Sequence, residues 1–305
     1  MQTIVECVPN FSEGADQNKI ESILQALTAG PDVHLLDTQM DADHNRTVVT
    51  FMGSREGVAE AALRAIGRAG ELIDLNEHCG VHPRIGATDV VPFVPIQGID
   101  LGNCAEIARW VAQETWRRFQ IPTYLYGAAA PDPRRRNLEN LRRGQFETLR
   151  EEVRENPDRR PDFGGATLHP TAGATAIGAR NFLIAYNINL NSTDLALAKS
   201  IARKIRTSDG GFAEVKAIGV EIKRLRVVQV STNLTDFLTT SITTVFDAVA
   251  AEAAHAGIAV GSSEIVGLVP RRAIESADIS HLKLRNFGPQ LILENKLAEM
   301  WRKSL

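Results

Sequence analysis

The order of the predicted strands and helices is the feature that most constrains what this chain can fold into. Runs of β-branched and other apolar residues predict strands, and apolar residues at helical spacing predict helices between them. In a first block, strands are predicted at 3–8, 33–38, 46–53, 89–96 and 123–127, with helices at about 16–29, after Ser54 and at 103–118. Pro92 and Pro95 are expected to keep their strand at a sheet edge or a bulge.

A second block begins after a proline- and glycine-rich connection at 157–179. Its strands are predicted at 182–190, 215–222, 226–234 and 263–269, with one helix from Ser192 or Thr193 to near Gly210 and another from Thr235 to His255. Both blocks contain the order strand–helix–strand–strand–helix–strand, which is typical of ferredoxin-like α+β sandwiches. We therefore predict an α+β fold of two ferredoxin-like βαββαβ subdomains, 1–180 and 181–305. Their sheets are expected to face each other, with a ligand tunnel between them.

The composition argues against several classes of function. A formal net charge of −3, with only 6% aromatic residues, does not suit a protein that binds phosphate backbones or stacks bases. No run of about 18 uncharged apolar residues predicts a membrane span, and Pro9 interrupts the N-terminus before a signal-peptide core could form. Three scattered cysteines do not make a disulfide framework. We expect a cytosolic protein that binds neither nucleic acid nor membrane.

The stretch HCGVHPRIGATDVVPF (78–93) gathers the most chemistry. A zinc site built from His78, Cys79 and His82 is one interpretation, but structural zinc sites use a second ligand pair, and none stands nearby. The alternative for His78 and Cys79 is an ordinary loop. His82 lies beside Pro83, which stiffens the backbone, and an imidazole held in this way suits proton transfer near neutral pH. The residue types alone leave His82 as one candidate, with no metal expected.

Seven stretches carry a resemblance to a known family. They are VECVPNFSEG (5–14), DHNRTVVTF (43–51), HPRIGATDVVPFVPI (82–96), PTYLYG (122–127), PDFG (161–164), GARNFLIAYNINL (178–190) and QVSTNL (229–234). In order, and over nearly the whole chain, they resemble the formiminotransferase family. The resemblance implies transfer of a formimino group from N-formimino-L-glutamate to N5 of tetrahydrofolate, two ferredoxin-like subdomains, and a homodimer. On this basis 1–180 is the N-terminal subdomain with the histidine loop and 181–305 is the C-terminal subdomain.

The resemblance also assigns residues. The histidine of the HPR motif, His82, is the implied acid/base catalyst, and tetrahydrofolate is the co-substrate. The implied folate-binding segment follows PDFG and comprises Gly164, Gly165, Ala166, Thr167, Leu168, His169, Pro170, Thr171, Ala172 and Gly173. Animal members carry an aromatic residue near the end of this segment, where Thr171 and Ala172 stand here.

Three further residues are candidates for holding the donor. Glutamate has two carboxylates, and guanidinium groups bind carboxylates through two parallel hydrogen bonds. Arg84 and Arg46 are the predicted partners, although Arg46 could equally be a surface residue of a strand edge. Asp37 could orient an imidazole or cap a strand. The arginine-rich stretch 131–144 is either a solvated surface or a site for the polyglutamate tail of folates.

Two other functions stay open from the sequence. The enzyme could use formiminoglycine or a formyl donor, because the sequence does not identify the residues of the donor pocket. A non-catalytic nucleic-acid-binding module with ferredoxin-like domains is the alternative from another class. It would need exposed aromatic residues for base stacking, which the composition does not favour.

Overall fold

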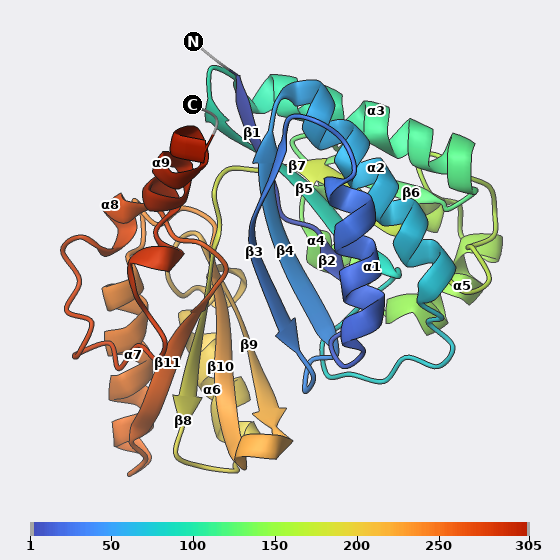
Figure 1. The fold of residues 1–305 in the computed structure, drawn as a ribbon. Helices are drawn as coiled ribbons and strands as arrows, with labels where there is room; N and C mark the ends of the chain where they lie inside the picture. Colours follow the sequence, from blue (N-terminus) through green and yellow to red (C-terminus); the bar gives the residue numbers. More distant parts are fainter. Residues whose placement is uncertain (1–2, 304–305) are drawn as a thin grey trace. The chain divides into compact units, whose positions relative to one another are not determined.

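The structure is a computed structural model that describes residues 3–303, so the ends of the two predicted domains, at 1–2 and 304–305, lie outside the described residues. Helices and strands are mixed, and the chain divides into two compact units, Met1–Asn181 and Phe182–Leu305 (Figure 1). This confirms the α+β class. Within residues 3–303, no helix is long and apolar enough to cross a membrane.

The first unit is built on a seven-stranded sheet. Its strands are β1 (Ile4–Cys7), β2 (Asn10–Phe11), β3 (Val33–Asp41), β4 (Arg46–Gly53), β5 (Thr88–Gln97), β6 (Thr123–Gly127) and β7 (Thr175–Ala179). Its α-helices are α1 (Gln17–Thr28), α2 (Arg55–Leu72), α3 (Leu101–Phe119), α4 (Leu138–Arg142) and α5 (Gln145–Glu155). β1 and β2 both pair antiparallel with β4 and β5, whereas β7 runs parallel to β5 and to β6.

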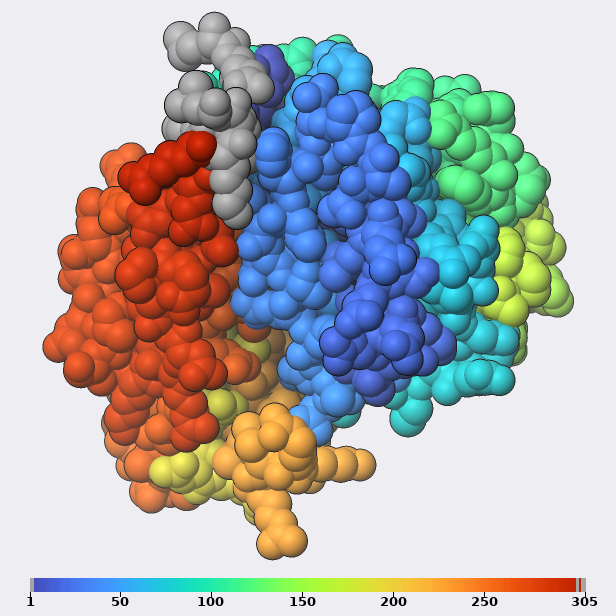
Figure 2. Space-filling view, viewed as in Figure 1, coloured from blue at the N-terminus to red at the C-terminus, as the bar shows by residue number. Residues whose placement is uncertain are grey.

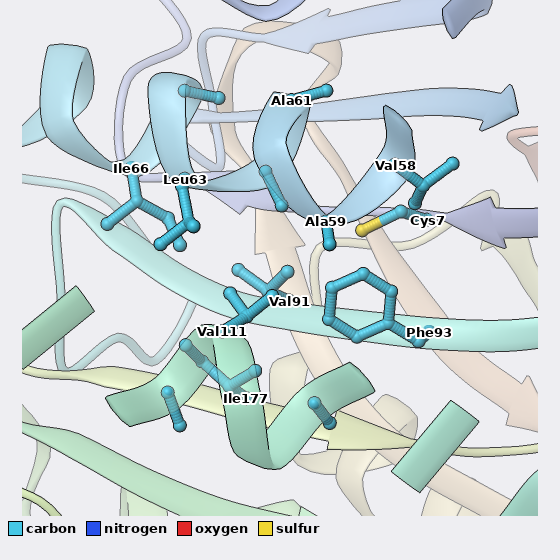
Figure 3. Close-up of a cluster of buried hydrophobic side chains, with 14 of the residues drawn as sticks. Cys7, Val58, Ala59, Ala61, Leu63, Ile66, Val91, Phe93, Val111 and Ile177 are labelled. Carbon is cyan, nitrogen blue, oxygen red and sulfur yellow. The ribbon is translucent and has the colours of Figure 1, made fainter. Parts of the chain in front are cut away.

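Side-chain alternation along the strands gives this sheet two different faces. On one face, apolar side chains pack against α1, α2 and α3; Figure 3 shows Ala59, Leu63 and Ile66 on the side of α2 that lies towards β5, with Val58 beside Cys7 of β1. The helices begin where the sequence supplies caps, at Asp16, Ser54 and Asp100, whose side chains accept backbone N–H groups of the first turn.

The opposite face is covered only in part by helices. There α4 and α5 contribute Leu141, Phe146 and Leu149 to a smaller core with residues of β5, β6 and β7. The part of this face formed by β1, β3 and β4 instead carries polar and charged residues at alternate positions, from Glu6 in β1 to Arg46 at the start of β4. The charged end of this face, at Arg46, is where the predicted histidine loop is found.

β5 differs from its prediction as an edge strand. It is central, pairing with β1 and β2 on one side and with β7 on the other. Proline removes a donor but keeps its acceptor, and the carbonyl of Pro92 still receives the N–H of Val8 at 3.3 Å. The expected irregularity does occur, because the pairings of β5 with β1 and with β2 both shift register.

The second unit contains a four-stranded antiparallel sheet in the order β11–β8–β10–β9. Its elements are β8 (Ile184–Leu190), α6 (Leu195–Ile205), β9 (Val215–Ile222), β10 (Val227–Leu234), α7 (Ile242–His255), β11 (Val260–Val266), α8 (Arg271–Ile274) and α9 (Leu293–Lys303). The predicted order strand–helix–strand–strand–helix–strand is present from β8 to β11. The turn between β9 and β10, at Lys223–Leu225, projects from the surface (Figure 2, orange).

The predicted start of the second helix in this unit is wrong. Thr235 does not cap α7; its hydroxyl contacts Glu214, and the helix begins after Ser241, whose side chain accepts the N–H of Thr244. Both residues are good caps by type. The residues between them form a turn in which Asp236 accepts the N–H of Leu238, so the helical pattern read from the apolar residues started about two turns too early.

Candidate functional site

The loop that carries His82 connects α2 to β5 and is fixed by hydrogen bonds just after the histidine. Asp89 accepts the N–H of Ile85 at 2.8 Å, and the hydroxyl of Ser12 donates to the carbonyl of Gly86 at 2.7 Å. The backbone N–H of Ala87 donates to Ala172 at 2.9 Å. Since a catalytic side chain must hold its position, a loop anchored at three successive residues is a suitable support.

His82 is held by a basic side chain. Nη1 of Arg46 lies 2.7 Å from Nε2 of His82. A guanidinium can only donate, so Nε2 accepts and the neutral ring carries its proton on Nδ1. Burial, together with the positive charges of Arg46 and Arg142, holds the pKa of His82 well below its ordinary range. The imidazole is therefore neutral at pH 7 and has one lone pair, occupied by Arg46.

The surroundings of Arg46 are unusual for a cation. Burial and the nearby charge of Arg142 lower the pKa of Arg46 to about 10, against the opposing effect of Asp89 and Asp41. Arg142, on the short helix α4, forms an ion pair with Asp89, which is only 2% exposed. Nε of Arg46 and Nε of Arg142 are both buried without a hydrogen-bond partner. Buried donors are normally satisfied, so these two N–H groups are exceptions that call for an explanation.

A second histidine lies beside the first. The rings of His44 and His82 are 6.4 Å apart between centroids, at 62° to each other. Nδ1 of His44 lies 2.8 Å from Asp41, which also accepts the backbone N–H of His44. Burial would raise the pKa of Asp41, but these hydrogen bonds outweigh it and lower that pKa to about 2. A permanently charged carboxylate thus orients the His44 ring.

Arg84 has a position that favours a structural role. Its guanidinium forms two hydrogen bonds with the carboxylate of Glu147, at 2.6 and 2.9 Å, and one with Gln145. Nε donates to Nδ1 of His78 at 3.0 Å. With its planar edge already matched to a carboxylate of α5, Arg84 joins the histidine loop to that helix and offers little to a donor molecule.

Asp37 lies in β3, where the pairing with β4 shifts register. Its carboxylate accepts the side-chain N–H of Gln39 at 3.0 Å. Side-chain alternation puts Asp37, Gln39 and Asp41 on the same face as Arg46, so Asp37 belongs to the polar face of the sheet. The carboxylate that orients a histidine here is that of Asp41.

The side chains of the proposed metal cluster do not converge. His78 donates from Nε2 to the carbonyl of Asn45 at 2.9 Å and accepts from Arg84, while His82 contacts Arg46. Cys79 is exposed. Among residues 3–303, no three His, Cys, Asp or Glu side chains are grouped so that they could hold a metal ion.

The segment Gly164–Gly173 divides into two parts. Gly164, Gly165 and Thr167 are exposed. The second part forms a tight hairpin from His169 to Gly173, in which Nδ1 of His169 accepts the N–H of Ala172 at 3.0 Å. An antiparallel bridge joins Gly173 to Gly86 of the histidine loop. The fold thus brings the predicted folate segment against the loop of His82.

The arginine-rich stretch is largely neutralised by aspartates. Arg134 pairs with Asp132 and Asp158, and Arg135 pairs with Asp162 at 2.8 Å. Arg136 and Arg143 are exposed. Arg142 is the member of this stretch that lies within the site. The sequence did not distinguish it, because it stands among several other arginines. Asp41 and His44 were also not singled out, although the acidic turn before Arg46 was a usable signal.

A surface hollow of about 520 Å³ lies in the second unit, beside α7 and the start of β11. Its lining is mainly alanine and other apolar residues, and it includes His281 and Lys283. None of the predicted site residues lines it, so this hollow is separate from the group around His82.

Comparisons with known sequences agree on one family. Residues 4–180 match the sequence model described as the formiminotransferase domain, N-terminal subdomain, and residues 185–295 match that of the formiminotransferase domain. The chain is 43% identical to a glutamate formimidoyltransferase of Streptococcus pyogenes, covering 97% of this chain and 99% of that protein. A glutamate formimidoyltransferase of Thermoplasma acidophilum is 42% identical, over 97% of this chain and 98% of that protein. The mouse formimidoyltransferase-cyclodeaminase is 42% identical over 91% of this chain, which spans about half (52%) of the mouse protein.

Proposed function

The chain belongs to the formiminotransferase family, and from this premise we propose that it transfers the formimino group of N-formimino-L-glutamate to N5 of tetrahydrofolate. It is then a folate-dependent transferase. The observation that carries the proposal is the neutral imidazole of His82, on an anchored loop and in contact with the guanidinium of Arg46, in a chain 43% identical to a glutamate formimidoyltransferase along almost its full length.

The proposed chemistry requires one group that both takes and returns a proton. N5 attacks the amidine-like carbon of the donor, and the tetrahedral adduct expels glutamate as an amine. N5 must lose a proton, and the leaving nitrogen must gain one. Nε2 of neutral His82 accepts the first proton, and the resulting imidazolium supplies the second, so the step closes without an external acid.

Glutamate leaves two carboxylates to be bound. Arg46 retains the role predicted for it, because its Nε is buried without a partner. Arg142 joins it in place of Arg84, whose guanidinium is engaged by Glu147. For tetrahydrofolate we propose contact with the exposed part of the segment Gly164–Gly173, above all Gly164, Gly165 and Thr167. No metal has a part in this scheme.

The direct test is an activity screen of the purified protein with tetrahydrofolate and three donors. Formiminoglutamate is expected to give the highest kcat/KM. Formiminoglycine tests whether the glutamate side chain is read, and N-formylglutamate tests whether the amidine nitrogen is required. An equal or faster rate with either of the last two would assign the enzyme to a different donor.

Two further properties are proposed from the family resemblance. They are a homodimeric assembly and a cytosolic location, where folates and the products of histidine degradation are available. Sedimentation equilibrium of the full chain tests the first. A monomer at micromolar concentration, with full activity, would exclude a required dimer.

A further inference from the structure

The guanidinium groups of Arg46 and Arg142 form a candidate anion-binding site. Arg142 pairs with Asp89, but no carboxylate in the described part of the chain lies within ion-pair distance of Arg46. Nε of each arginine is buried and unpartnered. Two cations close enough to affect each other's charge therefore retain two unused buried donors, and one directly paired carboxylate balances them. A buried arrangement of this kind is stabilised when an external carboxylate enters it.

Arg46 links this anion-binding site to His82. Its Nη1 occupies the only lone pair of the neutral His82 ring. A base whose lone pair accepts a hydrogen bond from a cation cannot take a proton from a substrate at the same time. A carboxylate is a stronger acceptor for guanidinium than an imidazole nitrogen, since it carries charge and accepts two parallel N–H bonds.

We propose that Arg46 and Arg142 bind one carboxylate of the donor, and that this binding draws Arg46 away from His82 and frees Nε2 to act as the base. The inference rests on the proposed function for the identity of the donor. The coupling itself depends only on the arginines, the histidine and a carboxylate. Arg46 is thus a positioning residue that makes the proton acceptor available only when an anionic donor is present.

The other charged groups around His82 are compatible with this change. They are Asp41 at the end of β3, His44 in the turn after it, Asp89 of β5, Arg142 of α4 and Tyr126 of β6, which senses the charge of Arg142. Asp41 and Asp89 are already engaged, by His44 and Arg142. Binding of an anion adds negative charge and removes a cationic contact, and both effects raise the affinity of His82 for a proton.

The experiment uses full-length protein with ¹³C-labelled histidine and glutarate as the probe, a dicarboxylate without any transferable group. The His82 resonance is assigned from its loss in His82→Gln, and its titration is followed by NMR with and without glutarate. We expect glutarate to move the His82 titration to higher pH. The signal of exposed His255 serves as an internal reference that does not move.

Variants separate anion binding by the two arginines from the contact between Arg46 and His82. Arg46→Met is expected to raise the pKa of His82 without any ligand and to abolish its response to glutarate. Arg142→Met keeps the contact between Arg46 and His82, and is expected to weaken glutarate binding by about 10- to 100-fold, the effect of losing a charge-assisted hydrogen bond. The matched control is Arg143→Ser, because Arg143 is the next residue and its side chain is exposed; it should bind glutarate as the wild type does.

The outcomes distinguish this inference from the proposed function. Glutarate binding that leaves the His82 titration unchanged, in a protein active with formiminoglutamate, would overturn the coupling and keep the function. A glutarate-dependent shift in a protein inactive with every formimino donor would keep the coupling and overturn the function. Equal glutarate affinity in the wild type and in Arg142→Met would show that Arg142 does not bind the carboxylate, and would overturn the proposed anion-binding site.

Discussion

His82 has one usable lone pair, and its position depends on a loop that is anchored just after it. Replacing His82 with Gln removes the proton acceptor but keeps a polar side chain of similar reach. We expect kcat to fall by about 10² to 10⁴, the usual contribution of a general acid/base, with little change in thermal stability. Steady-state kinetics and a melting curve check this.

The control for His82 is His255→Gln, at an exposed position near the end of α7. Its activity is expected to match the wild type. His78 is a poorer control, because its ring holds both Arg84 and the carbonyl of Asn45. A His82 variant with weaker folate binding but normal turnover at saturation would make His82 a binding residue instead.

Glu6 is a buried carboxyl group on the face of the first unit's sheet that also carries Arg46. It is 1% exposed, and burial raises its pKa to about 7 despite the charge of Arg180. The folded protein therefore binds this proton more tightly than the unfolded chain does. It follows that the free energy of unfolding decreases as pH rises from about 4.5 to about 7, by up to about 3 kcal/mol.

Glu6→Gln removes this dependence. The variant is expected to melt at a higher temperature than the wild type at pH 8, and at nearly the same temperature at pH 4.5, where Glu6 is already protonated. Calorimetry at the two pH values measures the difference. A variant destabilised equally at both would indicate that the charged form of Glu6 makes a favourable contact with Arg180.

At the scale of single elements, much of the fold follows from local sequence. The predicted antiparallel pair at 33–38 and 46–53 is confirmed as β3 and β4, and the helix after Ser54 is confirmed as α2. The two strands carry β-branched runs, and the helix has regular apolar spacing and a cap at Ser54. β7 was missed because its sequence, TAIGA, contains two alanines and a glycine, which are depleted in strands, and its strand state comes from pairing with β5 and β6.

The hairpin at the end of the segment Gly164–Gly173 is an element whose geometry depends on one glycine. Gly173 has φ +68°, and a Cβ there would lie 2.3 Å from the carbonyl oxygen of Ile85 in the histidine loop. Gly173→Ala is expected to lower both stability and kcat, because the loop must move. The measurements are the melting temperature and the kinetics with tetrahydrofolate.

Gly210→Ala is the matched control for Gly173. Gly210 also has a positive φ, +86°, but a Cβ there meets nothing within 4 Å. Both substitutions carry the same left-handed backbone cost of about 1 to 2 kcal/mol, so any larger effect at Gly173 measures the collision with Ile85. Equal losses of stability and unchanged kcat in both variants would mean that the hairpin does not position the loop.

At the scale of the whole molecule, only part of the candidate site could be predicted from the sequence. His82 and Arg46 stood in recognisable motifs, and the structure puts them 2.7 Å apart. Arg142 comes from a distant stretch, and only the folded chain brings it to Asp89 and towards His82. Such a group depends on tertiary contacts between α4, β4 and β5, which local patterns do not encode.

Treatment of the whole protein with a chelator tests the metal-free scheme. Activity is expected to be unchanged after dialysis against EDTA, because both ring nitrogens of His78 and Nε2 of His82 are occupied by protein partners. The rate with formiminoglutamate and tetrahydrofolate is the measurement. Loss of activity that added zinc restores would mean that the loop rearranges around a metal.

The parallel pairing of β5 with β7 joins segments that lie far apart in the chain. Contacts of long sequence separation form slowly, since the entropy of closing the intervening chain is lost before the pairing compensates for it. In the second unit, β9 and β10 are neighbours in sequence, and their hairpin has no such delay. Gly173, which bridges to Gly86, lies just before β7, so we expect this bridge to form together with the pairing of β7 and β5. A newly made chain therefore acquires most of its helices and hairpins before the loop of His82 is ordered, and catalytic competence is among the last properties to emerge during folding.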